Sequence, residues 1–470
     1  MRIEEDFLGK VEVPDNAYYG VFSVRAGKCF SQISGNRVPK ELIRAVALIK
    51  KCAALTNSEL GKLDQKKANA ISKASDEVID GKFDNEFLLD IFQAGAGTPL
   101  HMNTNEVIAN RAEELLGGKK GEYRLVHSNN DVNMSQSSND VVPTAIRIAS
   151  IWQAEKVIEE AEELQKILTK KAQKYKNLLK IGRTHLQDAV PMTYGQTFLA
   201  WSKSIEKDVE TITEALESVR KLGIGGTATG SGITAHPKFR EKIVQRITKE
   251  ARIRVEMASD SIETTQSMND LLKLSAALRA YASTVNRMAN DIRFLVSGPK
   301  GGINELSIPE IEPGSSIMPG KINPSIPEAV NMICWKVMGN DQAVLMAANS
   351  GQLELNFATP LIAQCLLESC LVLERGTKLF REKCVDGLEV NEKQVTENFK
   401  RSLCSATAFN PYLGYSKVSK LVREALEKNV SIADLIVEKE ILSRKDVDLI
   451  LQIATGPALV NEEIKKRVKV

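Results

Sequence analysis

The chain has 470 residues, of which 43% are hydrophobic and 26% charged, so it is long enough for about three average domains and can bury a large core. The 63 basic and 60 acidic side chains nearly cancel, and only 5% of residues are aromatic, which argues against nucleic acid or an anionic membrane as a partner. The seven cysteines lack metal-binding spacing, the first residues are charged, and no apolar run could span a bilayer; we therefore expect a cytoplasmic protein with free thiols and no structural zinc.

Residues 1–138 are expected to form a first domain in which short helices alternate with turns. Apolar spacing predicts helices over residues 39–58 and 104–117. The segment 13–20, with proline, asparagine and glycine, is typical of the turns between such helices.

Five long segments with an apolar stripe follow, and in the first three the apolar residues recur at alternating intervals of three and four. This spacing is typical of helices that pack along their length at a small crossing angle. A helix of about 30 residues is roughly 45 Å long, so we expect a long bundle within residues 139–388. The stripes are broader than one bundle requires, so helices of other subunits are expected to cover them. The segments are residues 140–176, 193–222, 268–296, 326–348 and 358–384.

A polar segment at 387–395 marks the end of this bundle, and residues 389–470 are expected to form a small helical C-terminal domain. Two Ser-x-x-Asp capping boxes, which begin at Ser431 and Ser443, predict helix starts within this domain. In such a box the serine hydroxyl accepts a hydrogen bond from a backbone N–H of the first turn, so each serine is expected to precede its helix directly.

Chemically useful side chains are concentrated in four polar segments that we expect to be unsuited to helix: residues 93–106, 127–140, 182–192 and 314–324. Three of the four histidines lie in these segments. A structural explanation exists as well, since a lone histidine is most often a satisfied buried side chain, and Asn139 could cap the helix that follows. The concentration of hydroxyls, amides and histidines in so few segments favours a shared site.

The composition of these segments excludes several classes of site. Because they contain no cysteine or acidic cluster, they do not form a metal site. They also lack a Walker lysine and a Gly-x-Gly-x-x-Gly turn after a strand, which argues against a nucleotide. The glycine-rich segment 223–232 connects one helix to the next, and we interpret it as a close-packing turn. The side chains of these segments fit a site for a small dianion, which neutral donors and Lys321 would hold, with an oxygen or imidazole base nearby.

Four motifs occur along the chain: GAGT…MNTNE from residue 95, QSSND from 136, GRTHLQDA from 182 and GSSIMPGKINP at 314–324. With these motifs, the sequence resembles the aspartase/fumarase superfamily over nearly its whole length. The resemblance implies a mainly α, three-domain subunit with a central bundle of long helices. It also implies a homotetramer in which three subunits contribute to each active site, which would account for the broad apolar stripes.

The reaction implied by the resemblance removes a proton next to a carboxylate and expels an amine or water from the neighbouring carbon, which leaves fumarate. The substrate would be a small dicarboxylate, and no cofactor or metal is required, although some aspartases are activated by a divalent metal. By resemblance, Ser315 in a mobile loop is the general base and His185 a second catalytic residue, oriented by Glu328. Lys321 and Asn323 would bind a substrate carboxylate. The other residues expected around the substrate are Thr98, Ser137, Ser138, Asn139 and Thr184.

Within the superfamily, several motifs favour an aspartate ammonia-lyase, which converts L-aspartate to fumarate and ammonia. Among them are residues 93–98 and 187–192, since class II fumarases usually read GSGT and QDATP in these places. QSSND at 136–140 and His127 are closer to the fumarase pattern, so a class II fumarate hydratase acting on L-malate is the alternative. His101 fits neither pattern, because both usually have asparagine there, and we expect it either to alter amine or carboxylate binding or to help protonate the leaving group.

A catalytically silent helical scaffold is a third hypothesis, because lyases of this superfamily have been recruited as structural proteins. Such a relative is expected to have lost its base or its cation, whereas Ser315, Lys321 and His185 are all present. Lyases of the superfamily that act on argininosuccinate or adenylosuccinate are further from the whole-chain pattern.

Overall fold

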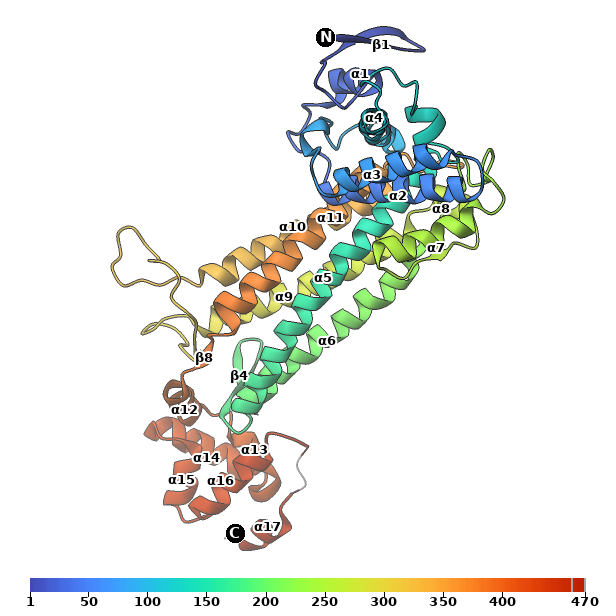
Figure 1. Cartoon of the computed structure of the whole chain (residues 1–470). Coiled ribbons are helices and arrows are strands. Elements are labelled where there is room, and N and C mark those ends of the chain that lie inside the picture. The colour runs from blue at the N-terminus through green and yellow to red at the C-terminus, as the bar shows by residue number, and fades with distance from the viewer. Residues whose placement is uncertain (458–459, 469–470) are drawn as a thin grey trace. The chain divides into compact units, whose positions relative to one another are not determined.

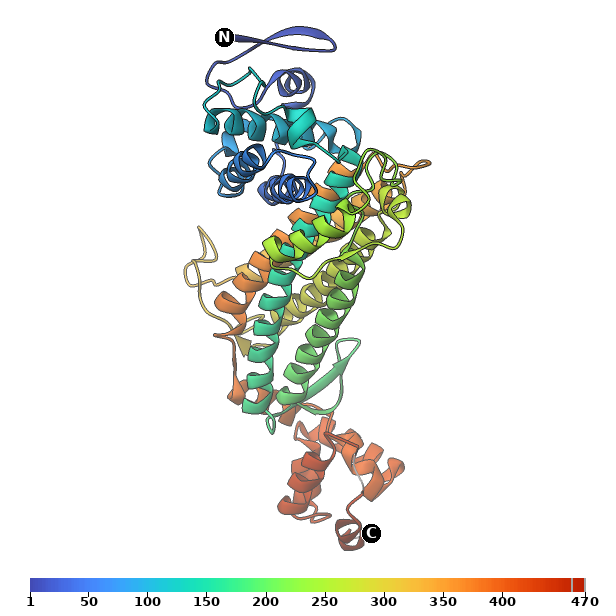
Figure 2. The same cartoon turned by 45° about the vertical axis from the view of Figure 1, so that its right-hand side comes forward.

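The computed structural model describes residues 1–457 and 460–468, and Figures 1 and 2 show its ribbon in two views. Most of these residues are helical, and their strands pair in short two-stranded sheets. This confirms the predicted mainly α fold class. The chain divides into two compact units. The first comprises residues 1–159, 208–282 and 333–375, and the second comprises residues 160–207, 283–332 and 376–470.

The boundaries between the two units fall inside the five long helices, so each of these helices contributes residues to both units. The predicted division into domains 1–138, 139–388 and 389–470 follows the order of the chain and remains a prediction. Residues 458–459 and 469–470 of the predicted C-terminal domain lie outside the described residues.

The five long helices predicted from their apolar stripes are present, with bounds close to those expected. Their stripes are buried at the predicted spacing, as Phe198, Trp201 and Ile205 of the second helix illustrate. Burial of such a stripe stabilises a long helix more than its intrinsic propensity does. The helices are α5 (Ser138–Lys174), α6 (Tyr194–Val219), α9 (Asn269–Leu295), α10 (Ser325–Ala348) and α11 (Thr359–Phe380).

Shorter elements complete the first unit. Its shorter helices are α1 (Val21–Phe30), α2 (Lys40–Glu59), α3 (Gln65–Ile79), α4 (Thr98–Leu115), α7 (Phe239–Ala251) and α8 (Ser261–Gln266). Helix α2, which confirms the helix predicted over residues 39–58, packs against α3 and α7, and α3 packs against α4. The antiparallel pair β1 (Arg2–Asp6) and β2 (Gly9–Val13) precedes these helices, and β5 (Lys221–Leu222) pairs in parallel with β6 (Glu256–Met257).

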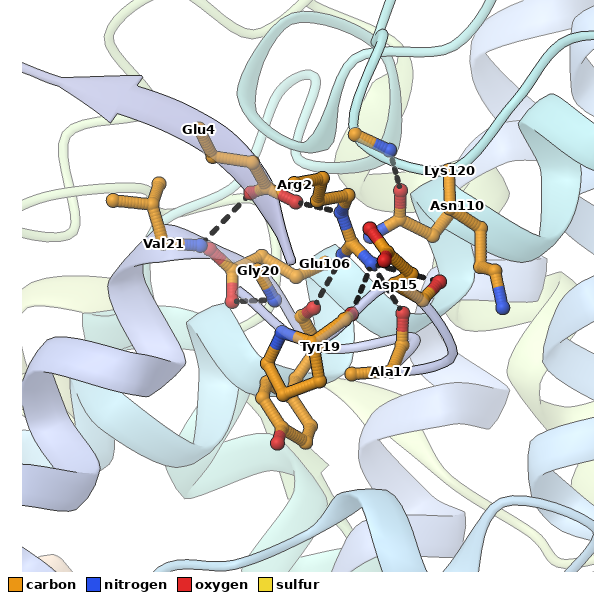
Figure 3. Close-up of polar contacts among 12 residues, drawn as sticks. Arg2, Glu4, Asp15, Ala17, Tyr19, Gly20, Val21, Glu106, Asn110 and Lys120 are labelled. Atoms are coloured by element: carbon orange, nitrogen blue, oxygen red, sulfur yellow. Dashed lines mark hydrogen bonds and ion pairs between the residues drawn. The ribbon is translucent and has the colours of Figure 1, made fainter. Parts of the chain in front are cut away.

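Two buried carboxylates hold the start of α1 in place (Figure 3). Glu106 Oε2 accepts a hydrogen bond from Gly20 N at 2.9 Å, and Glu4 Oε2 accepts one from Val21 N at 2.9 Å. Arg2 completes the cluster by donating to Glu4 Oε1 at 2.7 Å. The first N–H groups of a helix lack intrahelical acceptors and favour negative charge. Glu4 and Glu106 therefore do the work of an N-cap, although burial raises the pKa of Glu106 to about 7.

Polar side chains also connect the long helices within the first unit. Arg147 of α5 is 1% exposed and lies 2.7 Å from the carboxylate of Asp270 in α9. The Asn340 side chain of α10 donates to Ser369 Oγ of α11 at 3.2 Å. Because an unpaired buried polar group is costly, such contacts fix the register between neighbouring helices.

The second unit contains an antiparallel hairpin and the C-terminal helices. The hairpin strands are β3 (Leu179–Thr184) and β4 (Gln187–Thr193), and β7 (Leu306–Ser307) pairs with β8 (Glu389–Val390). Both predicted capping boxes are confirmed, because Ser431 Oγ and Ser443 Oγ accept from the backbone N–H three residues later at 3.0 and 3.1 Å. The helices are α12 (Glu392–Arg401), α13 (Ala406–Leu413), α14 (Tyr415–Lys428), α15 (Ile432–Glu438), α16 (Arg444–Ile453) and α17 (Glu462–Arg467).

The expectation that the four polar segments avoid regular structure is wrong for most of them. Helix α4 begins at Thr98, earlier than predicted. Gly97 adopts a left-handed conformation (φ 73°) just before the helix, and Pro99 lies in the first turn, where its missing N–H costs no hydrogen bond. The proline that we interpreted as part of a loop therefore helps to start a helix.

Two other polar segments also have regular structure. Residues 182–192 form most of the β3–β4 hairpin, and residues 128–132 form a short π-helix. Residues 314–324 contain neither helix nor strand, as predicted.

The glycine-rich segment 223–232 is a close-packing turn, as predicted. Gly225 N and Thr227 N both donate to Asp140 Oδ2 at 2.9 Å. Gly230 has a φ of 91°, and a Cβ there would lie 2.4 Å from Ile262 N, so only glycine fits. The turn is thereby held against the first turn of α5.

All seven cysteines are free, and only Cys29 is exposed. Within residues 1–457 and 460–468, no helix combines the length and apolar character needed to cross a membrane. In the same residues, no group of three or more histidine, cysteine, aspartate or glutamate side chains is placed to hold a metal ion.

Candidate active site

The loop at 314–324 is closed on itself by hydrogen bonds. Gly314 N donates to the carbonyl oxygen of Lys321 at 2.8 Å, and the Asn323 side chain donates to the carbonyl oxygen of Gly314 at 2.8 Å. A Cβ at Gly314 would lie 2.6 Å from the Lys321 oxygen, so this closure requires glycine. Asn323 thus supports the loop in addition to its predicted role in substrate binding.

Ser315 lies at the start of this loop. Its Oγ accepts hydrogen bonds from Ile317 N at 3.2 Å and from Met318 N at 3.1 Å. These contacts close a local serine turn, and they are also the donors that would stabilise a negative charge on the oxygen. Ser315, the predicted base, and the exposed Lys321 border a hollow of about 410 Å³ beside the loop, and Glu310 and Glu312 also line it.

The hairpin of the second unit carries Thr184 and His185 at its tip. His185 and Leu186 are the two turn residues and both have positive φ, 54° and 61°, which is the geometry of a type I′ turn. Thr184 and His185 are exposed in the single chain. Gly182 allows the two strands to approach closely, because a Cβ there would lie 2.7 Å from the carbonyl oxygen of Val190.

A buried carboxylate anchors the base of this hairpin tip. Glu305, which is fully buried, accepts from Arg183 at 2.7 Å, from Tyr194 Oη at 2.8 Å and from the Asn398 side chain at 3.1 Å. Burial alone would raise the pKa of Glu305, but the hydrogen bonds from Arg183 and Tyr194 hold it below the ordinary value. Glu305 was not predicted as a functional residue, and it fixes the residue next to Thr184.

In the first unit, the predicted substrate-binding residues Ser137, Ser138 and Asn139 lie at the start of α5. Ser137 Oγ accepts from Asn139 N at 3.3 Å, and Asp140 Oδ1 accepts from Ser137 N at 2.9 Å. The cap of α5 is therefore Ser137 rather than Asn139. The Asn139 side chain donates to the Ala228 carbonyl oxygen in the glycine-rich turn at 2.7 Å.

Asp140 is the buried carboxylate that holds this region together. Burial raises its pKa to about 6, although backbone N–H groups of Ser137, Thr227 and Gly225 favour the charged form. Its oxygens thereby connect the cap of α5 to the glycine-rich turn.

The start of α4, which carries Thr98, lies against α5. A Cβ on Gly97 would be only 3.0 Å from the Val142 side chain. Thr98 is half-buried beside this contact. The first unit therefore brings the N-termini of α4 and α5 together, and both termini offer a positive dipole end to an anion.

His101 lies one helical turn into α4 and is 1% exposed. Its Nδ1 is 2.7 Å from Ser138 Oγ, and its Nε2 is 2.5 Å from Lys50 Nζ. Burial, together with the charge of Lys50, holds the pKa of His101 well below its ordinary value. Lys50 was not predicted, although its position on the apolar face of α2, between Val46 and Ala54, is a sequence signal for a buried cation.

Glu328 lies in the first turn of α10, where its Oε1 is 3.8 Å from Arg293 Nη2. Within the described part of the chain, Glu328 and His185 form no hydrogen bond or ion pair with each other. The predicted pair of Glu328 and His185 therefore remains a prediction.

The chain is similar to known protein families and structures. The lyase family matches residues 9–339, and the fumarase C C-terminal family matches residues 406–455. An aspartate ammonia-lyase from Helicobacter pylori is 42% identical over 95% of this chain and 96% of its own length. The chain belongs to the aspartase/fumarase superfamily.

Two further relatives within the superfamily carry names other than aspartate ammonia-lyase. A class II fumarate hydratase from Helicobacter pylori is also 42% identical, over 95% of this chain and 96% of its own length. The crystal structure of a Brucella melitensis protein described as fumarate lyase:delta crystallin, bound to cobalt, has a TM-score of 0.92 and 38% identity, covering 97% of this chain and 100% of that one. Membership of the superfamily is thus confirmed, while identity alone does not separate the two lyase activities.

The structure of this superfamily member groups the predicted site residues by unit. The first unit contains Thr98, Ser137, Ser138, Asn139 and His101, and the second contains Thr184, His185, Ser315, Lys321, Asn323 and Glu328. In the second unit, one loop contains the predicted base Ser315 and the cation Lys321, and the hairpin tip contains Thr184 and His185. In the first unit, the predicted residues lie at or near the starts of α4 and α5.

Proposed function

We propose that this protein is an aspartate ammonia-lyase that converts L-aspartate reversibly to fumarate and ammonia. The observation that carries the proposal is the loop in which Ser315 Oγ accepts two backbone hydrogen bonds, while Lys321 borders the same hollow. A serine needs such donors to act as an alkoxide, and a dicarboxylate needs a fixed cation. The motifs at 93–98 and 187–192 favour aspartate over malate as the substrate.

In the proposed reaction, the Ser315 alkoxide takes a proton from C3 of L-aspartate. The electron pair of that C–H bond moves into the neighbouring carboxylate, which becomes a doubly charged aci-carboxylate. The pair then returns to form the C2–C3 double bond, and the C2–N bond breaks so that ammonia leaves with the bonding electrons. Lys321 and the neutral donors Thr98, Ser138 and Asn139 stabilise the negative charge of the intermediate.

The proposal includes a homotetramer with three subunits contributing to each active site. Helix α10 supports it, because large apolar side chains stay exposed along one face: Met332 is 59% exposed, Trp335 55% and Met346 73%. Met332, Trp335 and Met346 share the heptad spacing of a helix–helix seam. Thr184, His185 and Lys321 are also exposed in the single chain. Light scattering should give a mass of four times 51.8 kDa.

No metal or cofactor takes part in the proposed reaction, because proton abstraction and charge stabilisation are assigned to side chains of the chain itself. We place the protein in the cytoplasm, where its free cysteines would remain reduced.

A class II fumarate hydratase is the second candidate, favoured by the 42% identical fumarate hydratase and by QSSND at 136–140. In that reaction the same base would act on L-malate, and water would leave in place of ammonia.

The reverse reaction distinguishes the two candidates in a single incubation. Fumarate is supplied with ammonium, so that both ammonia and water are available for addition, and the product is identified by proton NMR. We expect L-aspartate from the wild-type protein and no product from Ser315→Ala. L-Malate as the only product would establish the hydratase, and no product with either nucleophile would favour the scaffold hypothesis.

A further inference from the structure

A buried chain of hydrogen bonds connects the middle of α2 to the first residue of α5. Lys50 Nζ lies 2.5 Å from His101 Nε2, and His101 Nδ1 lies 2.7 Å from Ser138 Oγ. Lys50 and His101 are 0% and 1% exposed, whereas Ser138 is half-buried. The chain therefore begins in the protein interior and ends at a residue that we propose contacts substrate.

The other partners of Lys50 define the direction of these hydrogen bonds. Lys50 Nζ donates to Asn133 Oδ1 at 3.0 Å and to Gln136 Oε1 at 2.9 Å. The two amides are themselves oriented, because the Gln136 NH₂ group donates to the Val132 and Met134 carbonyl oxygens and the Asn133 NH₂ group donates to the Gln136 carbonyl oxygen. Both amide oxygens therefore face Lys50 as acceptors.

A lysine ammonium has three N–H donors and no acceptor. Two of these donors are used by Asn133 and Gln136, so the third points to His101 Nε2, which must then be unprotonated. A neutral imidazole with a bare Nε2 carries its proton on Nδ1. His101 Nδ1–H consequently donates to Ser138 Oγ. Burial lowers the pKa of Lys50 well below its ordinary value, and the buried carboxylate of Asp140 opposes this shift by favouring the charged form that the proposal requires.

We propose that Lys50 and His101 are positioning residues that set the direction of the hydrogen bond to Ser138. The Ser138 hydroxyl then accepts from His101 and directs its own proton to the substrate carboxylate. This inference rests on the proposed function, because it assigns Ser138 to the donors around the intermediate. A donor that is already oriented needs no reorganisation when negative charge develops, which is where fixed dipoles contribute most to catalysis.

The proposal explains how histidine can stand where asparagine is usual. An asparagine side chain would offer an oxygen to Lys50 and an N–H to Ser138. Histidine and asparagine at position 101 therefore both donate the hydrogen bond to Ser138. Aspartate has the shape of asparagine and would pair with Lys50, but it has no proton for Ser138. The Ser138 hydroxyl would then turn toward the aspartate and lose its role as a donor to substrate.

The variants His101→Asn and His101→Asp therefore form a matched pair. We expect His101→Asn to retain kcat/KM within about tenfold of wild type and His101→Asp to lose about 100-fold, the usual cost of one oriented donor. The loss in His101→Asp should appear mainly in kcat, since the affected charge grows in the transition state. Equal activity of His101→Asn and His101→Asp, or an equal loss in both, would overturn the proposal.

A double-mutant cycle with Ser138→Ala tests whether His101 acts through Ser138. Once the hydroxyl is gone, adding His101→Asp should cost less than about threefold more. If the two losses multiply, His101 does not act through Ser138 and the proposal is wrong. The cycle uses folded tetramers only, as judged by light scattering and thermal unfolding.

Thr104→Val serves as the control for a change in the buried polar face of α4. Its hydroxyl donates to the Leu100 carbonyl oxygen, a contact within α4 in which Lys50, His101 and Ser138 take no part. We expect wild-type kinetics from this variant. All variants are assayed with the substrate that the wild type converts. If that substrate is L-malate, the proposed function fails, while the comparison of His101→Asn with His101→Asp still decides the inference.

Discussion

The guanidinium of Arg183 lies 2.7 Å from the fully buried carboxylate of Glu305. Arg183 directly precedes Thr184 and His185, so this ion pair fixes the strand end from which the hairpin tip projects. Tyr194 Oη donates to the second carboxylate oxygen of Glu305 at 2.8 Å, and the carboxylate is therefore satisfied on both sides. Glu305, which lies 122 residues after Arg183 in the sequence, thus controls where His185 is presented.

Replacing this carboxylate tests that control. Glu305→Gln should lower the free energy of unfolding by about 3 kcal/mol, because it leaves a largely buried arginine without its counter-charge. Urea unfolding measures the effect, and kcat should fall in the variant protein that still folds. Glu163→Gln is the matched control, since Glu163 is 52% exposed and binds Lys166 at the surface; its free energy of unfolding should stay close to that of the wild type. Similar losses in both variants would contradict the anchoring role of Glu305.

Ser315→Ala should lower kcat by about 1,000-fold, within the range of a general base, while leaving the oligomeric state unchanged. Ser316→Ala is the control, because this neighbouring hydroxyl lies on the same loop and is exposed. Steady-state kinetics with both variants measure the difference. A Ser315→Ala enzyme with a tenth of wild-type activity would remove Ser315 as the base.

Lys321→Ala should raise KM for the dicarboxylate and lower kcat as well, because the charge that Lys321 meets grows in the transition state. Lys300→Ala changes an exposed lysine in the preceding loop and should leave both constants near wild type. An unchanged KM in Lys321→Ala would place the substrate carboxylate elsewhere.

The carboxyl of Glu106 predicts a pH dependence of stability. Burial raises its folded-state pKa from 4.5 to about 7, so the folded protein binds a proton more tightly than the unfolded chain. Its contribution to stability is present below pH 4.5 and is lost as the pH rises through 7, a change of about 3 kcal/mol. Asp140 acts with the same sign, because burial raises its pKa to about 6.

Thermal midpoints of the wild type and Glu106→Gln between pH 5 and pH 8, a window chosen to bracket the pKa of about 7, measure this contribution. Glutamine has no ionisable proton, so the midpoint of Glu106→Gln should decline less steeply with rising pH. Parallel curves for the two proteins would show that Glu106 does not titrate in this range.

The long helices could be predicted from the sequence because their stability comes from one buried apolar stripe. The residues of such a stripe recur at regular intervals along the chain. Phe198, Trp201 and Ile205 are an example. The β3–β4 hairpin was missed because its type I′ turn is formed by His185 and Leu186 instead of the Asn-Gly pair that usually indicates such a turn.

The candidate residues could be named from motifs, but their partners could not. Lys50 and His101 are far apart in the chain, and only the packing of α2 against the neighbouring helices brings their nitrogens within 2.5 Å. Glu305 likewise lies in a loop whose sequence carries no signal for the arginine and tyrosine that bind it. Local patterns record burial and turns, whereas contacts between distant segments depend on the whole fold.

The most direct test of the account is the ratio of kcat/KM for L-aspartate to that for L-malate, measured from the ultraviolet absorbance of fumarate with one preparation of the wild-type protein. We predict that L-aspartate is preferred by at least about 100-fold, which is well within the discrimination that a site built to bind one polar group achieves. Preference for L-malate would contradict the proposed ammonia-lyase activity and make QSSND and His127 the residues that report the substrate.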